Sequence, residues 1–495
     1  LCVVGADADR ALSDLARVAL SVEELGRGFP DCYPSAQYLR RVDELRTAVL
    51  AAATASEPTA RKLRGLQVQI DELKREALVR SNPLLKDQRL VFARRYTYDS
   101  RHYYDDYYAG LREWGGNLCE LDLATGKVRE IVPQLDGGIF DRYDISADAR
   151  RIVFGYRARA PEGFRIWEVG VDGSGLRQLT FPPADEAERI ARHNVYSMAA
   201  LEQDPRLYGH WTDDMHPCYL PDGRIVFVSS RSERTVLCGG HALTCTTLYR
   251  IDADGQNLHQ LSQGALTEST PTMLDDGRIL YTRWEYVYKG IGAIQSLWAV
   301  RPDGTGAEEI YGHNIDNPGV FFAGRQIPGR PDLIVATGCG HEPLAVGSIQ
   351  LIDRKKDRRT KEAMTSLTPE IETRGLRGFY QFRNGKWSEH DIYGPFYCDP
   401  FPLADPQTHA GAGEYFLVSH NPHGRYNARC AYGIYLMDSF GNRVLVYDDP
   451  EMSCFQPMVL APRPEPRELT PLADASDAVS EAEDEATVVL VDLYR

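Results

Sequence analysis

Several sequence features that would assign a function directly are missing from this 495-residue chain. Its ten cysteines include no Cys-x-x-Cys pair, so the sequence holds neither a paired-thiolate zinc motif nor a Cys-x-x-Cys-His haem attachment site. A Gly-x-Ser-x-Gly elbow is also missing, which excludes a peptidase domain of the prolyl-oligopeptidase type. There is no P-loop and no Rossmann fingerprint. Because no nucleophile–base pair is visible, a complete enzyme within these residues is the least supported interpretation.

The sequence also lacks an excess of positive charge and any long apolar run. Its formal net charge is −15, which argues against a nucleic-acid partner. No run of about 18 apolar residues predicts a transmembrane helix. The first residues, LCVVGADADRALSDLARV, lack the basic region and cleavage site of a signal peptide. Because the chain begins with Leu1 and not with Met, this is no evidence for a cytosolic protein.

The chain does contain a repeated pattern of short apolar strands separated by Asp-Gly turns. The clearest copy, HPCYL-PDG-RIVFVSS followed by TLYRID-ADG-QNLHQLS, runs from His216 to Ser262, and a second runs from Ser269 to Ile310. In such turns Asp supplies a side-chain acceptor and Gly supplies a positive φ. Repeats built from four short strands are typical of β-propellers. We therefore expect an all-β fold, a six-bladed β-propeller with a helical segment before it.

The first blade is expected to be completed by the end of the propeller sequence. Residues 82–462 carry the six predicted blades, and the first blade lacks its innermost strand. The segment SCFQPMVLAP at 453–462 is similar to the innermost strands HPCYLP and STPTML. We expect this C-terminal strand to close the ring, which would remove the exposed sheet edges.

Three further segments are expected outside the propeller. Residues 1–81 are predicted to be helical, with one apolar stripe formed by Leu63, Leu66, Ile70, Leu73 and Ala77. This segment is interpreted as a helical hairpin packed on the propeller; a dimerising coiled coil is the alternative. Residues 463–487 read as an acidic, proline-containing linker. Residues 488–495 read as the strand-like start of a further domain.

One loop of the third blade has the residues of a candidate zinc site. Cys238, His241 and Cys245 follow one another at short spacing, and thiolate and imidazole are good zinc ligands. A fourth ligand, Asp214 or His216, could come from the start of the innermost strand. The alternative is a hairpin loop with two half-buried thiols and a surface histidine.

Other candidate residues lie in long loops expected on the same face of the propeller. Asp213, Asp214 and His216 could bind a metal or act in acid–base chemistry, or they could hydrogen-bond loop backbone at the propeller mouth. Tyr103 and Asp106 lie in a tyrosine-rich loop that could stack on a ligand or on a neighbouring domain. With His341, in the loop GCGHEPLAVG, they are the candidate cofactor-contacting residues.

The sequence resembles known families at two levels. The stretch LPDGRIVFVSSR…LYRIDADGQNLHQLS is similar to the TolB-type propeller repeat. Five longer stretches resemble the hydrazine synthase alpha-subunit-like proteins typical of planctomycetes: NPLLKDQRLVFARR, DMHPCYLPDGRIVFVSSR, DDGRILYTRWEYV, QSLWAVRPDGTGAEEIYG and AYGIYLMDSFGNRVLVY. The resemblance extends over residues 82–462. It implies a propeller that precedes a domain with c-type haem, and in true hydrazine synthase a haem and a zinc ion share the active site.

The resemblance leads to a hypothesis about function. We expect a non-catalytic propeller module, at most part of an oxidoreductase, that serves as scaffold and active-site wall for a haem-bearing domain or redox subunit. The haem is expected outside this chain and zinc is possible within it. A periplasmic or other extracytoplasmic location follows from the resemblance, because c-type haem is attached there. The alternative is a TolB-like propeller that binds a protein or ligand without chemistry.

Overall fold

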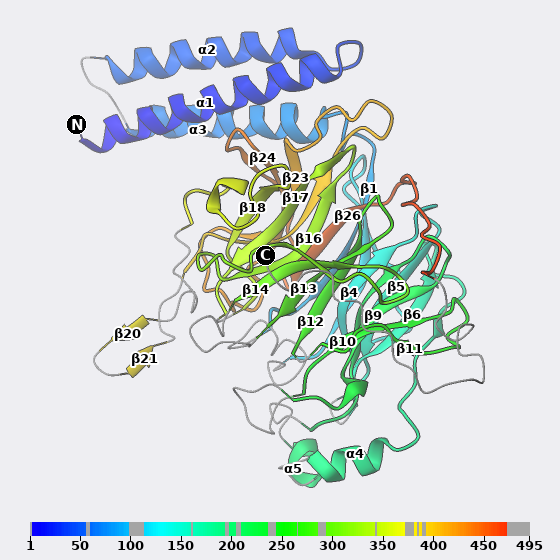
Figure 1. Cartoon of the computed structure of the whole chain (residues 1–495). Coiled ribbons are helices and arrows are strands. Elements are labelled where there is room, and N and C mark those ends of the chain that lie inside the picture. The colour runs from blue at the N-terminus through cyan, green and yellow to red at the C-terminus, as the bar shows by residue number, and fades with distance from the viewer. Residues whose placement is uncertain are drawn as a thin grey trace.

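The computed structural model consists of a layer of helices beside a larger β region (Figure 1). It describes residues 2–55, 60–98, 113–159, 162–193, 198–203, 209–235, 244–264, 266–285, 294–341, 344–371, 381–383, 386–388 and 393–472. Within these ranges, no helix combines the length and the apolar character that a membrane crossing requires.

The helical layer has three helices where the sequence predicted a hairpin. They are α1 (Cys2–Gly28), α2 (Ser35–Ala53) and α3 (Ala60–Arg75), and α3 continues into the π-helical turn η1 (Glu76–Arg80). The predicted stripe from Leu63 to Ala77 is buried, as expected. The hairpin interpretation was wrong because α1 carries a stripe of its own. The buried residues of that stripe are Leu15, Val18, Val22 and Leu25.

The helical layer is fixed to the β region by buried polar contacts. The Tyr415 hydroxyl donates a hydrogen bond to the Ser21 backbone oxygen of α1 at 3.0 Å. The Asn442 amide donates to the Arg17 backbone oxygen at 3.0 Å. Inside the layer, Lys74 of α3 forms a 3.0 Å ion pair with Asp14 of α1, and both side chains are largely buried.

The β region contains units of four antiparallel strands, each a simple meander. The six units are β26–β1–β2–β3 (Ser453–Val459, Arg89–Arg95, Gly116–Asp122 and Val128–Glu130), β4–β5–β6–β7 (Ile139–Ile145, Arg151–Arg157, Arg165–Gly170 and Arg177–Gln178), β8–β9–β10–β11 (Asp214–Tyr219, Ile225–Ser229, Thr247–Ile251 and His259–Gln260), β12–β13–β14–β15 (Glu268–Met273, Ile279–Trp284, Gln295–Val300 and Glu308–Tyr311), β16–β17–β18–β19 (Val320–Ile327, Arg330–Cys339, Ser348–Asp353 and Met364–Ser366) and β22–β23–β24–β25 (Phe396–Leu403, Tyr415–Asn421, Gly433–Asp438 and Arg443–Tyr447). Among the described residues, one parallel bridge, Gln295 to Val320, joins two of them, and no sheet closes on itself.

The pairing of the C-terminal strand is as the sequence predicted. Strand β26 pairs antiparallel with β1, with Val459 opposite Leu90 and Ser453 opposite Arg95. The first unit is therefore built from two segments that are far apart in the sequence. The Asp-Gly turns also form as expected: Gly223 and Gly277 have φ values of 81° and 88°.

The first strands of the units lie next to one another in chain order. Strand β4 contacts β8, β8 contacts β12, β12 contacts β16, β16 contacts β22, and β22 contacts β26. The remaining contact, between β26 and β4, is made by the Tyr143 hydroxyl, which donates to the backbone oxygen of Gln456. We refer to β4, β8, β12, β16, β22 and β26 as the inner strands.

All six inner strands carry a β-bulge at the same place. The register against the neighbouring strand shifts after Phe140, Met215, Ser269, Phe322, Cys398 and Phe455. Five of the residues that follow have a left-handed backbone: His216, Thr270, Ala323, Asp399 and Gln456. Proline comes next at four of these positions (217, 271, 400 and 457), where its missing N–H suits an unpaired bulge. The bulges thus direct one residue of each inner strand toward its neighbours.

Additional elements lie in two long connections. Helices α4 (Glu186–His193) and α5 (Met198–Gln203) lie between β7 and β8, at the end of the molecule away from the helical layer in Figure 1. A two-stranded hairpin, β20 (Gln381–Arg383) and β21 (Lys386–Ser388), lies between β19 and β22.

Candidate functional site

Two clusters of buried polar side chains meet strand β8. The rim cluster consists of Arg165, Glu186, Asp213, Asp214 and Arg231, near the start of the strand. The bulge cluster comes from all of the inner strands except β16. It consists of Asp141, Arg142, His216, Thr270, Asp399 and Gln456. Charged groups are rarely buried unless they are paired, so each cluster is a candidate site whose pairing must be accounted for.

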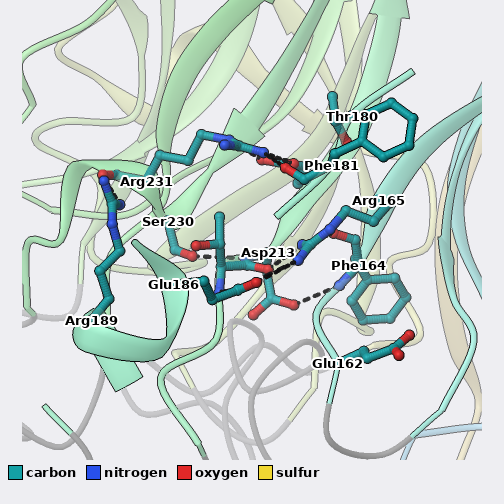
Figure 2. A network of polar contacts seen from close by, with 12 residues as sticks. Glu162, Phe164, Arg165, Thr180, Phe181, Glu186, Arg189, Asp213, Ser230 and Arg231 are labelled. Carbon is teal, nitrogen blue, oxygen red and sulfur yellow. Dashed lines mark hydrogen bonds and ion pairs between the residues drawn. The ribbon is translucent and has the colours of Figure 1, made fainter. Parts of the chain in front are cut away.

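Asp213 of the rim cluster has only one of its carboxylate oxygens hydrogen-bonded. Its Oδ1 accepts a 2.8 Å hydrogen bond from the Phe164 backbone N–H, while no hydrogen-bond partner for Oδ2 lies among the described residues (Figure 2). Burial raises the pKa of Asp213 to about 7, although Arg157 and Arg165 favour the charged form. The Asp213 carboxyl is therefore the group in this cluster whose charge changes near neutral pH.

The pKa of the adjacent Asp214 is shifted in the opposite direction, downward. Its Oδ1 and Oδ2 accept hydrogen bonds of 2.9 and 2.6 Å from the Arg231 guanidinium, and the Ser229 hydroxyl donates to Oδ1 at 2.7 Å. Burial alone would raise the pKa of Asp214, but the Arg231 charge and these hydrogen bonds lower it below its ordinary value. Asp214 is thus an ionised partner in a bidentate pair.

The rim cluster also attaches helix α4 to the β region. Glu186, in the first turn of α4, accepts hydrogen bonds from Arg165 Nη2 at 3.2 Å and from the Thr212 backbone N–H at 2.6 Å (Figure 2). Arg189, one turn later, donates to the Arg231 backbone oxygen at 2.9 Å. The carboxylates at this rim therefore hold loop backbone and a helix in place, and an acid–base role for them stays a prediction.

In the bulge cluster, His216 is a buried and neutral histidine. Its Nδ1 accepts a 3.2 Å hydrogen bond from the Thr270 backbone N–H, so the ring proton lies on Nε2, which is 3.5 Å from Asp141 Oδ2. The His216 backbone N–H donates to the same oxygen at 3.3 Å. Burial lowers the pKa of His216 to about 4 and outweighs the opposite effects of Asp141 and Asp399.

An ion pair links the other side of the bulge cluster. Arg142 of β4 pairs with Asp399 of β22. With the Gln456 amide oriented so that its oxygen faces Arg142, that oxygen accepts from Nε at 3.2 Å and from Nη1 at 3.0 Å. Side chains from β4, β22 and β26 are thereby joined near the bulges. This cluster ties the inner strands together.

The structure separates the sequence-predicted site residues. Asp214 belongs to the rim cluster and His216 to the bulge cluster. Cys245 is buried next to the isolated bridge between Thr235 and Thr244, and its backbone N–H donates to the Arg234 oxygen at 2.7 Å. In the part of the chain that the structure describes, no three His, Cys, Asp or Glu side chains are grouped to hold a metal.

His341 makes contacts at another loop of the same β region. Its Nδ1 lies 3.0 Å from Gln295 Nε2, and its ring centroid is 5.1 Å from that of Trp284. Tyr103, Asp106, Cys238 and His241 lie outside the described residues. The zinc site and the cofactor contacts therefore stay predictions.

Sequence reasoning missed the bulge cluster although the sequence contains a signal for it. The four bulge prolines stand at the same place in HPCYL, TPTML, DPFPL and QPMVL, one residue after the left-handed position. Aligning the repeats on these prolines would have placed Thr270, Asp399 and Gln456 beside His216. In that alignment, the residues that precede the prolines are all polar, which predicts a polar cluster at the bulges.

Comparison with known proteins supports the fold and no narrower identity. No family model and no curated protein matches the chain. Among solved structures, Kuenenia stuttgartiensis hydrazine synthase is similar with a TM-score of 0.54 and 17% identity, covering 77% of this chain and 48% of that chain. TolB from Acinetobacter baumannii is similar with a TM-score of 0.42 and 10% identity, covering 82% and 74%. The chain spans about half the length of the hydrazine synthase chain. The likeness to the hydrazine synthase chain shows the fold alone, which is mostly β.

Proposed function

We propose that this chain is the propeller module of a larger, haem-associated redox protein similar to hydrazine synthase. In this proposal it is a scaffold and forms one wall of the active site, while the haem belongs to a partner domain or subunit. Supporting this, the fold is similar to hydrazine synthase over 77% of the chain and corresponds to about half of that protein. The sequence stretches that resemble the alpha-subunit-like proteins lie in the same β region.

We also infer that the six units close into one six-bladed ring. The single observation that carries this inference is the pairing of β26 with β1, which places the last strand in the first unit. The contacts between successive inner strands, including Tyr143 with Gln456, support it. A closed ring has no open sheet edge at the junction and holds its loops rigidly, as a scaffold requires.

The rim cluster supports a scaffolding role over catalysis by this chain. Two of its carboxylates, Asp214 and Glu186, each form an ion pair with an arginine and hold a loop or helix. A general base needs access to a substrate proton, whereas these groups already accept hydrogen bonds from protein donors. The remaining carboxyl, Asp213, is buried.

The experiment is a metal and haem analysis of the protein expressed from its complete reading frame together with a cytochrome c maturation system. We expect covalently attached haem, zinc at a stoichiometric level, and recovery of the protein from an extracytoplasmic fraction. A purified protein with neither iron nor zinc would contradict the proposal. The variant His241→Ala is expected to lower the zinc content if the predicted loop holds the metal.

A TolB-like binding propeller is the second candidate function. It is favoured by an open hollow between the inner strands, lined in part by Arg142, His216 and Arg325. Under this alternative, Cys238→Ala and His241→Ala would leave stability, metal content and any redox activity nearly unchanged. The metal analysis therefore separates the two candidates.

A further inference from the structure

Two residues after each bulge, the inner strands bring a second set of side chains together. This set, which we call the Arg325 level, comprises Tyr143, Cys218, Thr272, Arg325, Phe401 and Met458. Its composition differs from that of the bulge cluster, because it contains a single charged residue and no carboxylate. Alternation along a strand places residues two apart on the same side, so both levels face the space between the inner strands.

The one cation of this level has apolar neighbours. Arg325 Nη2 lies 3.6 Å from the thioether sulfur of Met458, and the guanidinium carbon lies 5.6 Å from the Phe401 ring centroid. Among the described residues, no carboxylate forms an ion pair with Arg325. Burial lowers the pKa of Arg325; the negative charge of Asp144 opposes this effect and the positive charge of Arg463 adds to it. A guanidinium in such surroundings is costly unless an anion offsets its charge.

The carboxylates nearest to Arg325 already have other partners. Asp144, one residue beyond the Arg325 level on β4, accepts from Arg463 Nη2 at 2.9 Å and from the Tyr219 backbone N–H at 3.1 Å. Asp399 of the bulge cluster is paired with Arg142. The fold therefore pairs Arg142 and Arg463 with carboxylates and leaves Arg325 without an ion pair among the described residues.

These donors border an open hollow. Arg325 lines it together with Arg142, Tyr143, His216, Thr270 and Thr272, and the free space, including its mouth, is about 290 Å³. The side-chain hydroxyl of Thr272 donates to the Gly324 backbone oxygen at 2.8 Å, so Arg325 is the main available donor on this wall.

We propose that this hollow binds a small oxyanion, the carboxylate or phosphate group of a small molecule, through Arg325. The planar guanidinium presents paired N–H donors that match the two oxygens of such a group. Met458 and Phe401 would exclude water from one side of the contact, which strengthens it. The proposal is independent of the haem association and holds for either candidate function.

The test is calorimetric titration of the full chain, without haem or partner, with sodium phosphate and separately with sodium acetate at pH 7 and constant ionic strength. We expect saturable one-site binding of at least one of the two anions, and the tighter one identifies the source. Arg325→Met keeps much of the side-chain volume and removes the charge, so we expect binding to weaken at least about tenfold. Arg325→Lys keeps the charge without the planar fork, so we expect a weakening of about threefold or more.

The matched control is Arg250→Met on β10. Arg250 is another partly buried arginine whose pKa is lowered by burial, and it does not line the hollow. We expect this variant to bind as the unsubstituted chain does. If Arg325→Met does not fold, judged by circular dichroism, Arg325→Lys carries the test.

Two results would overturn the proposal: no saturable binding of either anion up to 50 mM, on the order of the weakest useful affinity, or equal binding by the Arg325 variants. Neither result would affect the metal and haem analysis, which examines a different part of the protein. Failure of this inference is thus distinguishable from failure of the proposed function.

Discussion

The rim cluster and the bulge cluster share strand β8 but use buried charge in different ways. At the rim, Asp214 and Glu186 are each paired with an arginine, and the Glu186 pair fixes helix α4. At the bulges, His216 is kept neutral, and backbone N–H groups and Asp141 are its partners. Ion pairs thus anchor the loop and helix at the rim, whereas an ion pair and a neutral histidine together join the inner strands at the bulges. Arg325, just beyond the bulges, follows neither pattern.

The largest expected effect is at the rim. Arg231→Met leaves Asp214, whose side chain is fully buried, without its counter-charge, and we expect a loss of about 3–5 kcal/mol in the free energy of unfolding. The exposed pair of Arg358 and Glu308 gives the control, since Arg358→Met should cost under about 1 kcal/mol. Urea denaturation measures both. Equal losses would show that the rim pair is no more important than a surface contact.

The second prediction uses the raised pKa of Asp213. Unfolded Asp213 loses its proton near pH 4, while the folded form keeps it to about pH 7. Across that window the folded state binds more protons, so the contribution of Asp213 to stability falls as pH rises. Asp213→Asn removes this dependence and should gain roughly 2–4 kcal/mol relative to the unsubstituted chain between pH 4 and pH 8. Thermal unfolding at both pH values measures it, and a constant difference would contradict the assignment.

The third prediction concerns the neutral histidine of the bulge cluster. Its pKa of about 4 lies below the unfolded value of 6.5, so the unfolded state binds more protons between these values. Stability from this group is present above pH 6.5 and is lost as pH falls toward 4. His216→Gln should remove roughly 2–3 kcal/mol of that acid-side loss. The control is His259→Gln, because His259 is exposed. If both variants change the slope of the unfolding free energy against pH by the same amount, a special role for His216 is excluded.

The smallest expected effect tests the shared bulge itself. Pro217→Ala frees the backbone of the unfolded chain at the bulge of β8 and should reduce stability by about 0.4–1 kcal/mol. Pro271→Ala, at the same place on β12, should cost a similar amount. Urea unfolding of the two variants checks this. A stabilising effect at either position would argue that the proline strains the bulge.

The repeat and its turns could be predicted because their causes are local. Gly223 and Asp222 form a turn through their own backbone and side chain, and the segment 453–459 carries the same pattern as the other inner strands. The opposite pKa shifts of Asp213 and Asp214 could not be predicted from local sequence. Their difference depends on Arg231, 17 residues later, which reaches one carboxylate and not the other. Because the two residues are adjacent aspartates, the local sequence does not indicate which of them Arg231 binds.

The missed features also have physical reasons. The buried stripe of α1, at Leu15, Val18 and Val22, has the same three- and four-residue spacing as that of α3, so this third helix could have been predicted from the sequence. The isolation of Arg325 depends on Phe401 and Met458, which come from two other units. Only the assembly of the inner strands brings them together. A contact between separate repeats becomes visible in the sequence only after the repeats are aligned on their bulges.

The central claim is that β26 closes the β region by completing its first unit. Urea unfolding of the chain ended after Met452 compared with the chain ended after Leu472 tests it most directly. We predict that the shorter chain loses the cooperative transition of the β region, because β1 and the inner strands β4 and β22 lose their common neighbour. An unchanged midpoint and slope in the shorter chain would contradict the account.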